Sequence, residues 1–225
     1  AAYFDALAQA SLAEIDGTLD VPGVTAEVRV LRDEWGVPHI YAENQMDLFF
    51  AQGWVQAQDR LWQMDMWRRV NEGRLSEILG PEGFEHDKLA RLIMFRGPWE
   101  DEWTSYHPDG KRVFEAFAAG VNAYIDHIGD DLPVEYKLTG LIPLRWTPEA
   151  STGRVATALP IGNARQELQL ARQIAERGLD AVNAERRVNA TNWIDIQTPQ
   201  DVDYSIITPE VIEAARHFHA DFPVP

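Results

Sequence analysis

The chain has 225 residues, 45% of them hydrophobic, with eight Trp and nine Phe, which is enough for a sizeable core in one large domain or a domain and a half. Its formal net charge of −16 argues against nucleic acid and anionic membranes as partners, because both attract the opposite sign. Cysteine is absent, which excludes disulfides, a cysteine nucleophile and Cys-based zinc sites, and no apolar run has the length of a transmembrane helix.

The first part of the chain predicts a helix and then a β-hairpin. Apolar residues recur with helical spacing over residues 3–15. Residues 26–31 alternate between an apolar and a polar side, residues 33–36 form a turn, and residues 37–42 form a second strand. Pro38 has no N–H group, so its strand begins there or lies at the edge of a sheet.

A long amphipathic helix follows, which opens at Asp47 and runs toward Val70. Its apolar residues recur at steps of three and four: Phe50, Trp54, Ala57, Leu61 and Met64. Its charged residues form candidate ion pairs: Asp59 with Arg60, and Asp65 with Arg68 or Arg69. This pattern favours a helix that packs on one face and carries salt bridges on the other.

The rest of the chain predicts more helices and no further strand. The predicted segments are 75–79, 86–95, 112–128, 154–177 with a kink near 160–162, and a last helix that begins at Thr208–Pro209. Pro133, Pro143 and Pro148 mark an irregular connection between the third and fourth segments. A lone hairpin is marginally stable in water, so the strands indicate a sheet that belongs to another polypeptide.

Catalytic motifs are missing from the sequence. It contains no GxSxG elbow, no HExxH motif and no glycine-rich phosphate loop. A Ser–His–Asp site assembled from distant parts stays open, but no residue nominates one. The histidines lack metal-ligand spacing and favour structural or surface roles: His39, His86, His107, His127, His217 and His219. The dense stretch 32–69 therefore indicates the frame around a site, with no catalytic group of its own.

Several motifs resemble, in the right order, the α chain of the penicillin acylase family. They are RDEWGVPHIYAEN, DLFFAQGWVQAQDRLWQMDMWRR, GRLSEILG, AAGVNAYID and RWTPE. The resemblance covers roughly residues 21–176 and is specific as a combination, although no single motif is. The remainder of the chain matches loosely.

The resemblance implies an α+β fold, in which a mostly helical α chain completes the four-layer αββα core of an N-terminal-nucleophile hydrolase with a separate β chain. The whole of 1–225 is then a single α-subunit domain, with an N-terminal helix and arm over 1–20, the family-matching region over 21–176 and a C-terminal wrap over 177–225. The family's precursor is exported and cuts itself into an α chain, a spacer and a β chain. A periplasmic or secreted location is therefore expected, and because no basic segment precedes an apolar one, any signal peptide has been removed or never existed.

The resemblance also implies that the β chain begins with the nucleophile, a Ser whose own α-amine is the base. A free amino terminus titrates near ~7.7–8.0, so it can accept the hydroxyl proton at neutral pH, and an oxyanion hole then holds the tetrahedral intermediate. Ala1 has no nucleophilic side chain, so we expect no catalytic residue in this chain. The expected reaction is hydrolysis of an amide between a hydrophobic acyl group and an amine, such as a β-lactam nucleus, a homoserine lactone or a lipopeptide core.

The resemblance places two sites in ATALPIGNARQELQLAR, after RWTPE. Leu159, Pro160, Ile161 and Asn163 bracket the acyl pocket, where an edge of Leu and Ile would suit a flexible aliphatic chain as well as phenylacetyl. Glu167 best matches a ligand of a structural calcium shared with the β chain, which must supply most of the about six to eight oxygens that the ion takes. Ordinary kink and core residues, and an exposed helix glutamate, are the alternatives.

Two other classes of function stay open. A non-catalytic, secreted, acidic helical binding module predicts a stable monomer without a β chain. An unrelated hydrolase with a dispersed site predicts activity from this chain alone. The incomplete sheet, the start at Ala1 and above all the family resemblance favour the α chain, with a β chain and a small acyl amide as its partners.

Overall fold

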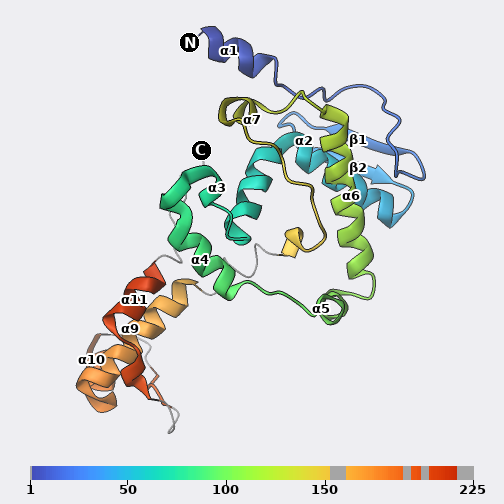
Figure 1. Ribbon diagram of the computed structural model, residues 1–225. Coiled ribbons are helices and arrows are strands. Elements are labelled where there is room, and N and C mark those ends of the chain that lie inside the picture. The colour runs from blue at the N-terminus through green and yellow to red at the C-terminus, as the bar shows by residue number, and fades with distance from the viewer. Residues whose placement is uncertain (1, 153–160, 190–193, 199–202, 217–225) are drawn as a thin grey trace.

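The computed structural model describes residues 2–152, 161–189, 194–198 and 203–216 (Figure 1). As the sequence predicts, these residues are mostly helical and contain one pair of strands. No helix within these ranges is long and apolar enough to cross a membrane. The elements, in chain order, are α1 (Ala2–Gln9), β1 (Val28–Arg32), β2 (Pro38–Ala42), α2 (Gln45–Asn71), α3 (Ser76–Leu79), a 3-10 helix (Gly80–Gly83), α4 (Phe84–Ile93), α5 (Trp99–Tyr106), α6 (Gly110–Ile128), α7 (Val134–Thr139), α9 (Ile161–Arg177), α10 (Leu179–Asn189), a second 3-10 helix (Tyr204–Ile206) and α11 (Pro209–Arg216).

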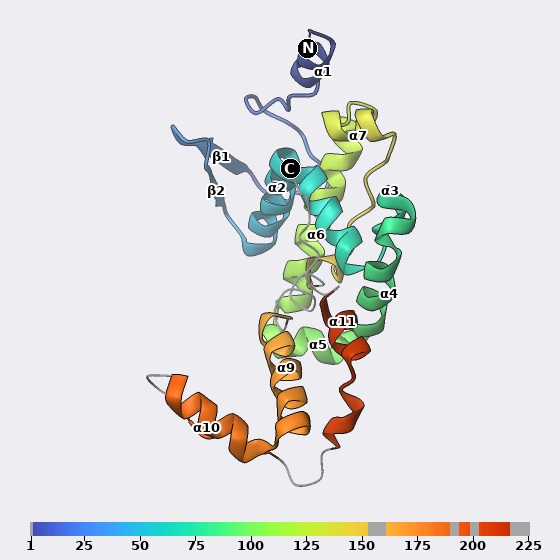
Figure 2. The same cartoon turned by 90° about the vertical axis from the view of Figure 1, so that its left-hand side faces the viewer.

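The predicted hairpin is confirmed. Strands β1 and β2 pair antiparallel, with Pro38 at the start of β2 opposite Arg32. The side chain of Asp33 orders the turn, because its Oδ1 accepts hydrogen bonds from the backbone nitrogens of Trp35 (3.0 Å) and Val37 (2.9 Å). Trp35 is 79% exposed, and Figure 2 shows the hairpin extending from one side of the helices. Among the described residues no third strand joins this sheet.

The start of α2 differs from the prediction. Asn44, and not Asp47, caps the helix, since its Oδ1 accepts the backbone N–H of Asp47 at 2.9 Å. The carboxylate of Asp47 is buried and reaches back along the chain. It accepts hydrogen bonds from the backbone nitrogens of Thr25 (3.0 Å) and Ala26 (2.9 Å) and from the Thr25 hydroxyl (2.8 Å). Asp47 thus fixes the segment before β1 to the first turn of α2.

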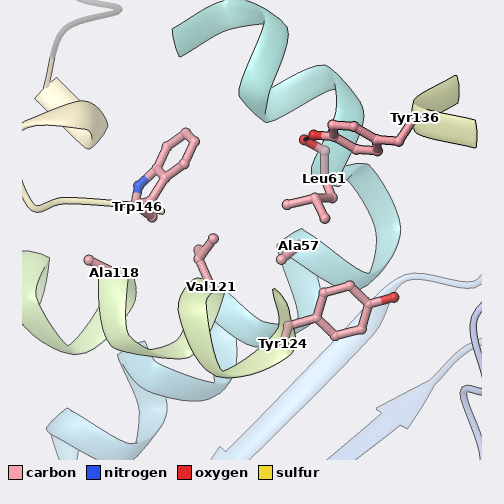
Figure 3. Close-up of a cluster of buried hydrophobic side chains, with 7 residues drawn as sticks. All are labelled: Ala57, Leu61, Ala118, Val121, Tyr124, Tyr136 and Trp146. Carbon is pink, nitrogen blue, oxygen red and sulfur yellow. Dashed lines mark hydrogen bonds between the residues drawn. The ribbon is translucent and has the colours of Figure 1, made fainter. Parts of the chain in front are cut away.

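Helices α2 and α6 cross at the centre of the fold, and their contact forms the main core (Figure 3). The helix predicted over 112–128 is confirmed as α6, and its apolar side is in the core, because Val121 and Tyr124 are buried and Phe117 and Ile128 pack against them. Two side chains from beyond α6 close the cluster. Its buried members are Ala57, Leu61, Ala118, Val121, Tyr124, Tyr136 and Trp146.

The two central helices touch backbone to backbone. A Cβ atom on Gly53 would lie 2.1 Å from the carbonyl oxygen of Phe117, and one on Gly120 would lie 1.9 Å from that of Phe50. Any side chain at either glycine would therefore push the helices apart. This reciprocal contact sets how closely α2 and α6 approach.

Helices α10 and α11 each pack on α9 at one end of the molecule (Figures 1 and 2). Helix α9 covers the second part of the predicted segment 154–177, whereas residues 153–160 lie outside the described ranges. Helix α11 begins at Pro209, as predicted. Among the elements with described bounds, the sequence did not predict α5, α7 and α10, and α7 lies inside the connection that the prolines at 133, 143 and 148 predict to be irregular.

Candidate functional site

A pocket of about 370 Å³ opens beside the second half of α2. Its size lies within the range of about 300–1,000 Å³ that is usual for ligand pockets. Helix α2 supplies most of the wall, α6 supplies one aromatic ring, and the segment after α7 closes the far side. The lining residues are Gln56, Arg60, Gln63, Met64, Trp67, Arg68, Phe117, Trp146 and Ser151.

One face of α2 gives the pocket its polar wall. Gln56, Arg60, Gln63 and Trp67 follow at steps of four, three and four, which places them on the same side of a helix. The first three are exposed and Trp67 is half-buried. The helix is kinked at Arg60, whose φ of −145° and ψ of 25° are not helical. Arg60 forms no hydrogen bond or ion pair with any residue that the structure describes.

The floor of the pocket is held by Arg68, which is 8% exposed. Its Nε donates to Glu72 Oε1 at 2.6 Å, and its guanidinium also donates to the carbonyl oxygen of Arg145. The same guanidinium lies 5.6 Å from the centre of the Trp146 ring, within cation–π range. The indole Nε1 of Trp146 donates to Ser151 Oγ at 3.0 Å. The guanidinium of Arg68 and the indole of Trp146 therefore hold each other in position.

A buried ion pair lies behind this wall. Arg69 Nε donates to Asp65 Oδ2 at 3.1 Å, and the hydroxyl of Tyr136 donates to the same oxygen at 3.2 Å. Arg69 also donates to Glu77 and to the carbonyl oxygen of Ile142. Burial raises the pKa of Asp65, and the charge and hydrogen bonds of Arg69 and Tyr136 oppose that rise.

The predicted pair of Asp65 with Arg69 is confirmed, but its predicted exposure is wrong. Asp65 and Arg69 are each 2% exposed, because the segment after α7 covers this face of α2, where the carbonyl oxygen of Ile142 accepts a hydrogen bond from the guanidinium of Arg69. The predicted pair of Asp59 with Arg60 is also wrong. Asp59 instead accepts two hydrogen bonds from Arg32 of β1, at 2.8 and 3.0 Å. Both differences arise from segments that are remote in sequence.

The structure describes only some of the site residues that were predicted from the resemblance. Leu159 and Pro160 lie outside the described residues. Ile161 and Asn163 lie in the first turn of α9, where the backbone is described and the side chains are not. Glu167 lies on α9 with an exposed side chain. The structure therefore does not test these four residues as a pocket edge.

The described residues do not assemble a calcium site by themselves. No group of three or more His, Asp or Glu side chains within the described ranges is placed to hold a metal ion. Glu167 could contribute one ligand, and calcium takes about six to eight oxygens. Any such site needs oxygens from beyond these residues.

The structural or surface roles that the sequence favours are found for His39, His127 and His107. His39 Nε2 lies 3.3 Å from Asp33 Oδ2 in the exposed hairpin. The ring of His127 packs against Trp54, with 5.2 Å between the ring centres. His107 Nδ1 accepts the backbone N–H of Asp109 at 3.1 Å. His217 and His219 lie outside the described residues.

The described lining of the pocket has groups suited to binding a ligand. Its described lining contains one hydroxyl, that of Ser151, which is engaged by Trp146, and it contains no histidine or carboxylate that could act as a base. What it offers is a guanidinium, two amides and aromatic walls, which suit an anionic group with an apolar neighbour. The sequence reading missed this pocket, although the spacing of Gln56, Arg60 and Gln63 in an otherwise amphipathic helix was a usable signal.

The comparisons with known proteins agree on one family. The model of the penicillin amidase family matches residues 27–199. A penicillin acylase 2 proenzyme of Pseudomonas sp. (strain SE83) is 42% identical over 140 residues, which are 62% of this chain and 18% of the relative. Penicillin G acylase of Escherichia coli is 36% identical over 132 residues, 55% of this chain and 15% of the relative. An acyl-homoserine lactone acylase, QuiP, of Pseudomonas aeruginosa is 36% identical over 141 residues, 63% of this chain and 17% of the relative.

Among solved structures, the chain is similar to one chain of a thermostable penicillin G acylase from Alcaligenes faecalis. The TM-score is 0.59 at 24% identity, and the match covers 79% of this chain and 98% of that chain. The chain therefore spans less than a fifth of each of the three curated relatives, whereas it spans nearly all of one chain in the solved structure.

Proposed function

This chain belongs to the penicillin amidase family, and we propose that it is the α chain of a heterodimeric amidohydrolase whose nucleophile is the N-terminal Ser of a separate β chain. The observation that carries the proposal is the difference in coverage. The match extends over 98% of a separate chain of a solved penicillin G acylase but over 15–18% of the curated relatives. The matched region is therefore a small part of the relatives that forms a separate chain in the solved enzyme, which supports an α chain.

Exposed hydrophobic side chains on the surface of the chain support the proposal of a partner chain. Large hydrophobic side chains are exposed on the hairpin, including Trp35 at 79%, Val37 at 51% and Tyr41 at 57%. Others are exposed on the N-terminal segment, including Tyr3 at 71% and Leu12 at 70%. Such surfaces are typical of interaction sites when they are contiguous. A β chain that completes the sheet would cover the hairpin.

The proposed reaction is the hydrolysis of an amide between a hydrophobic acyl group and an amine. The α-amine of the Ser on the β chain removes the hydroxyl proton, the hydroxyl attacks the amide carbonyl, and an oxyanion hole stabilises the tetrahedral intermediate. The amine then leaves, and water releases the acid from the acyl-enzyme. This chain contributes no catalytic group in the proposal; it frames the acyl pocket, with Leu159, Pro160, Ile161 and Asn163 at its edge.

The names of the relatives support two types of amine. Two of them are penicillin acylases and one is an acyl-homoserine lactone acylase, so a β-lactam nucleus and a homoserine lactone are the leading amines, with a lipopeptide core as a third. The proposal also includes a structural calcium that Glu167 binds together with β-chain carboxylates, and a periplasmic or secreted location. Calcium depletion of the purified heterodimer should lower its melting temperature if the ion is present.

The composition of the native particle tests the proposal first. We expect intact-mass analysis of protein purified from its source to find a second, larger chain, and sequencing of its amino terminus to read Ser. This chain alone, monomeric and well folded, would contradict the proposal and would fit the alternative of a non-catalytic binding module.

Acyl specificity is tested by hydrolysis of matched amides. Because the pocket edge carries Leu and Ile where an aromatic edge would favour rings, we expect octanoyl amides to be hydrolysed at a rate comparable to that of phenylacetyl amides. A kcat/KM for the phenylacetyl amide that exceeds the octanoyl value by about a hundredfold or more, a difference in transition-state energy of about 2.7 kcal/mol, would contradict an aliphatic pocket.

A further inference from the structure

We propose that the pocket beside the kink of α2 is a docking site for a carboxylate side chain of the partner chain, with Arg60 as its counter-ion. The inference rests on the proposed function, because it requires a β chain. It goes beyond that function by naming the contact, the residue on this chain and the chemistry of the group on the partner.

The charges along α2 single out Arg60. The chain has 36 acidic and 20 basic residues, so a basic side chain has a surplus of acids with which to pair. The neighbouring acids on this helix are already engaged, Asp59 by Arg32 of the hairpin and Asp65 by Arg69. Arg60 has no such partner among the described residues. The positive charge of Arg60 is therefore available to an anionic group of another molecule.

The surroundings of Arg60 are shaped for an anion that enters with an apolar neighbour. Gln56 and Gln63 lie one turn away on either side, on the same face of α2, and their amides can donate hydrogen bonds. Phe117 and Trp146 form an apolar wall opposite. The described lining holds two arginines and no carboxylate. Arg68 is already paired with Glu72, so Arg60 supplies the positive charge that an incoming carboxylate complements.

A partner chain explains this site better than a free small anion. Arg60 is exposed, and water screens the attraction between an exposed guanidinium and a dissolved anion. A protein surface that covers the pocket removes that water, so the same ion pair becomes stronger and more selective. The occupant is therefore an Asp or Glu side chain of the β chain, flanked there by apolar residues that contact the aromatic wall.

The experiment uses the processed heterodimer with the substitution Arg60→Lys, which places an amine where the guanidinium lies. Treatment with a water-soluble carbodiimide joins an amine to a carboxylate in direct contact with it. We expect one new cross-linked peptide, absent from the unsubstituted protein, that connects residue 60 to an Asp or Glu of the β chain. The matched control is Arg186→Lys on α10, an exposed arginine that also has no partner among the described residues, and it should give no such peptide.

A second measurement follows the separation of the chains in the Arg60→Gln variant. We expect dissociation at least about tenfold faster than in the unsubstituted heterodimer, because loss of one partner leaves a covered carboxylate without its counter-ion. Arg186→Gln should change the rate by less than about twofold.

Three outcomes would overturn the inference. The first is the absence of a cross-link to the second chain, and the second is a cross-link confined to carboxylates of this chain. The third is an unchanged dissociation rate with a raised KM, which would assign the guanidinium to a substrate carboxylate. If purification finds no second chain at all, the proposed function itself fails, and this result is distinct from a heterodimer that is indifferent to Arg60.

Discussion

Buried aspartates connect segments of this chain that are distant in sequence. Asp47 holds the segment before β1, and Asp87 of α4 accepts hydrogen bonds from the backbone nitrogens of Leu75 (2.6 Å) and Ser76 (2.8 Å). Both carboxylates are at most 4% exposed. Each buried carboxylate is satisfied by backbone donors of another segment, and leaving such a carboxylate without these partners would be costly.

These aspartates make the stability of the chain depend on pH. Burial alone would raise the pKa of Asp47 and of Asp87, but the hydrogen bonds that each accepts outweigh it and hold the pKa below the usual value. A lowered pKa in the folded state gives stability that is present above the unfolded pKa, about 3.9, and is lost as pH falls through the folded value.

We therefore expect the free energy of unfolding to decrease steadily as the pH is lowered from about 5 to about 3. Asp87→Asn should make the chain less stable at neutral pH and should flatten this decrease, because the variant has no carboxylate to protonate. Urea titrations at several pH values measure both effects. Asp5→Asn on the exposed first helix changes the net charge equally without removing a buried hydrogen bond, and an equal flattening in that variant would contradict the assignment.

Tyr136 offers a second test at the scale of one residue. It is 1% exposed and its hydroxyl donates to the buried carboxylate of Asp65. Burial and the neighbouring negative charge of Asp65 raise the pKa of Tyr136 far above its usual value, so the hydroxyl remains a donor at any ordinary pH. Tyr136→Phe should lower the stability by about 1–3 kcal/mol, because the ring still packs on Trp62 while the carboxylate loses a donor.

Thermal or urea unfolding of the Tyr136→Phe variant measures this loss. Tyr41→Phe, at a position that is 57% exposed, removes the same atom where water replaces it and should change the stability by less than about 0.5 kcal/mol. Equal effects at the two positions would show that the hydroxyl of Tyr136 has no special role.

At the scale of elements, sequence periodicity predicted the helices and strands with a clear pattern of apolar residues. The hairpin, α2 and α6 were predicted because their apolar residues recur with clear periods and their ends carry turn or cap residues. Helices α5, α7 and α10 were missed because they are short or strongly charged. For α7 the boundary signals were present, with Pro133 just before the helix and Gly140 just after it in the left-handed region at φ 71°.

Burial within an element could not be predicted from its own pattern. The spacing of Asp65 and Arg69 predicted their ion pair, but the same spacing occurs on exposed helices. What buries this pair is the cover of Tyr136 and of the segment near Ile142, which is remote in sequence. The kink at Arg60, with neither proline nor glycine at that residue, gave no signal either.

The contact between α2 and α6 yields a prediction for an element. In a helix, Gly→Ala usually stabilises by about 1 kcal/mol. At Gly120 the added methyl group would meet the backbone of Phe50, so Gly120→Ala should destabilise the chain by about 3 kcal/mol or more. Ala119→Gly, on the neighbouring exposed position of the same helix, should cost only about 1 kcal/mol.

Chemical denaturation of the two variants gives the comparison. A Gly120→Ala protein that is as stable as the unsubstituted one would mean that the two helices can move apart without cost.

At the scale of the whole molecule, the sequence predicted one pair of strands and a sheet completed by another polypeptide. The pair is confirmed, because β1 and β2 of the described residues pair with each other, and the second polypeptide stays a prediction. The proposed acyl-pocket and calcium residues came from the family resemblance and not from periodicity. Of these, Leu159 and Pro160 lie outside the described ranges, and the proposed calcium site would need ligands from a second chain, which this sequence does not contain.

The incomplete sheet predicts a change in hydrogen exchange. In the isolated chain, the amides of β1 and β2 belong to a lone hairpin and should exchange rapidly. In the heterodimer, a covering β chain should slow them by about a hundredfold or more, equivalent to about 2.7 kcal/mol of added protection. Mass spectrometry of peptides that span 26–42 measures the difference, and peptides from the centre of α6 provide an internal reference.

Slow exchange of the hairpin in the isolated chain would contradict this prediction, because the hairpin would then be stable without a partner.

The reciprocal fit of Gly53 and Gly120 also bears on how this subunit can evolve or be engineered. Each glycine faces a carbonyl oxygen of the main chain, and no exchange of a neighbouring side chain can shorten a main chain. A substitution at one glycine therefore has no compensating substitution at the other, and the two positions are constrained independently. Members altered at either site should be depleted from random libraries, so the search for new specificities is better directed to the proposed acyl-pocket edge at Leu159, Pro160, Ile161 and Asn163.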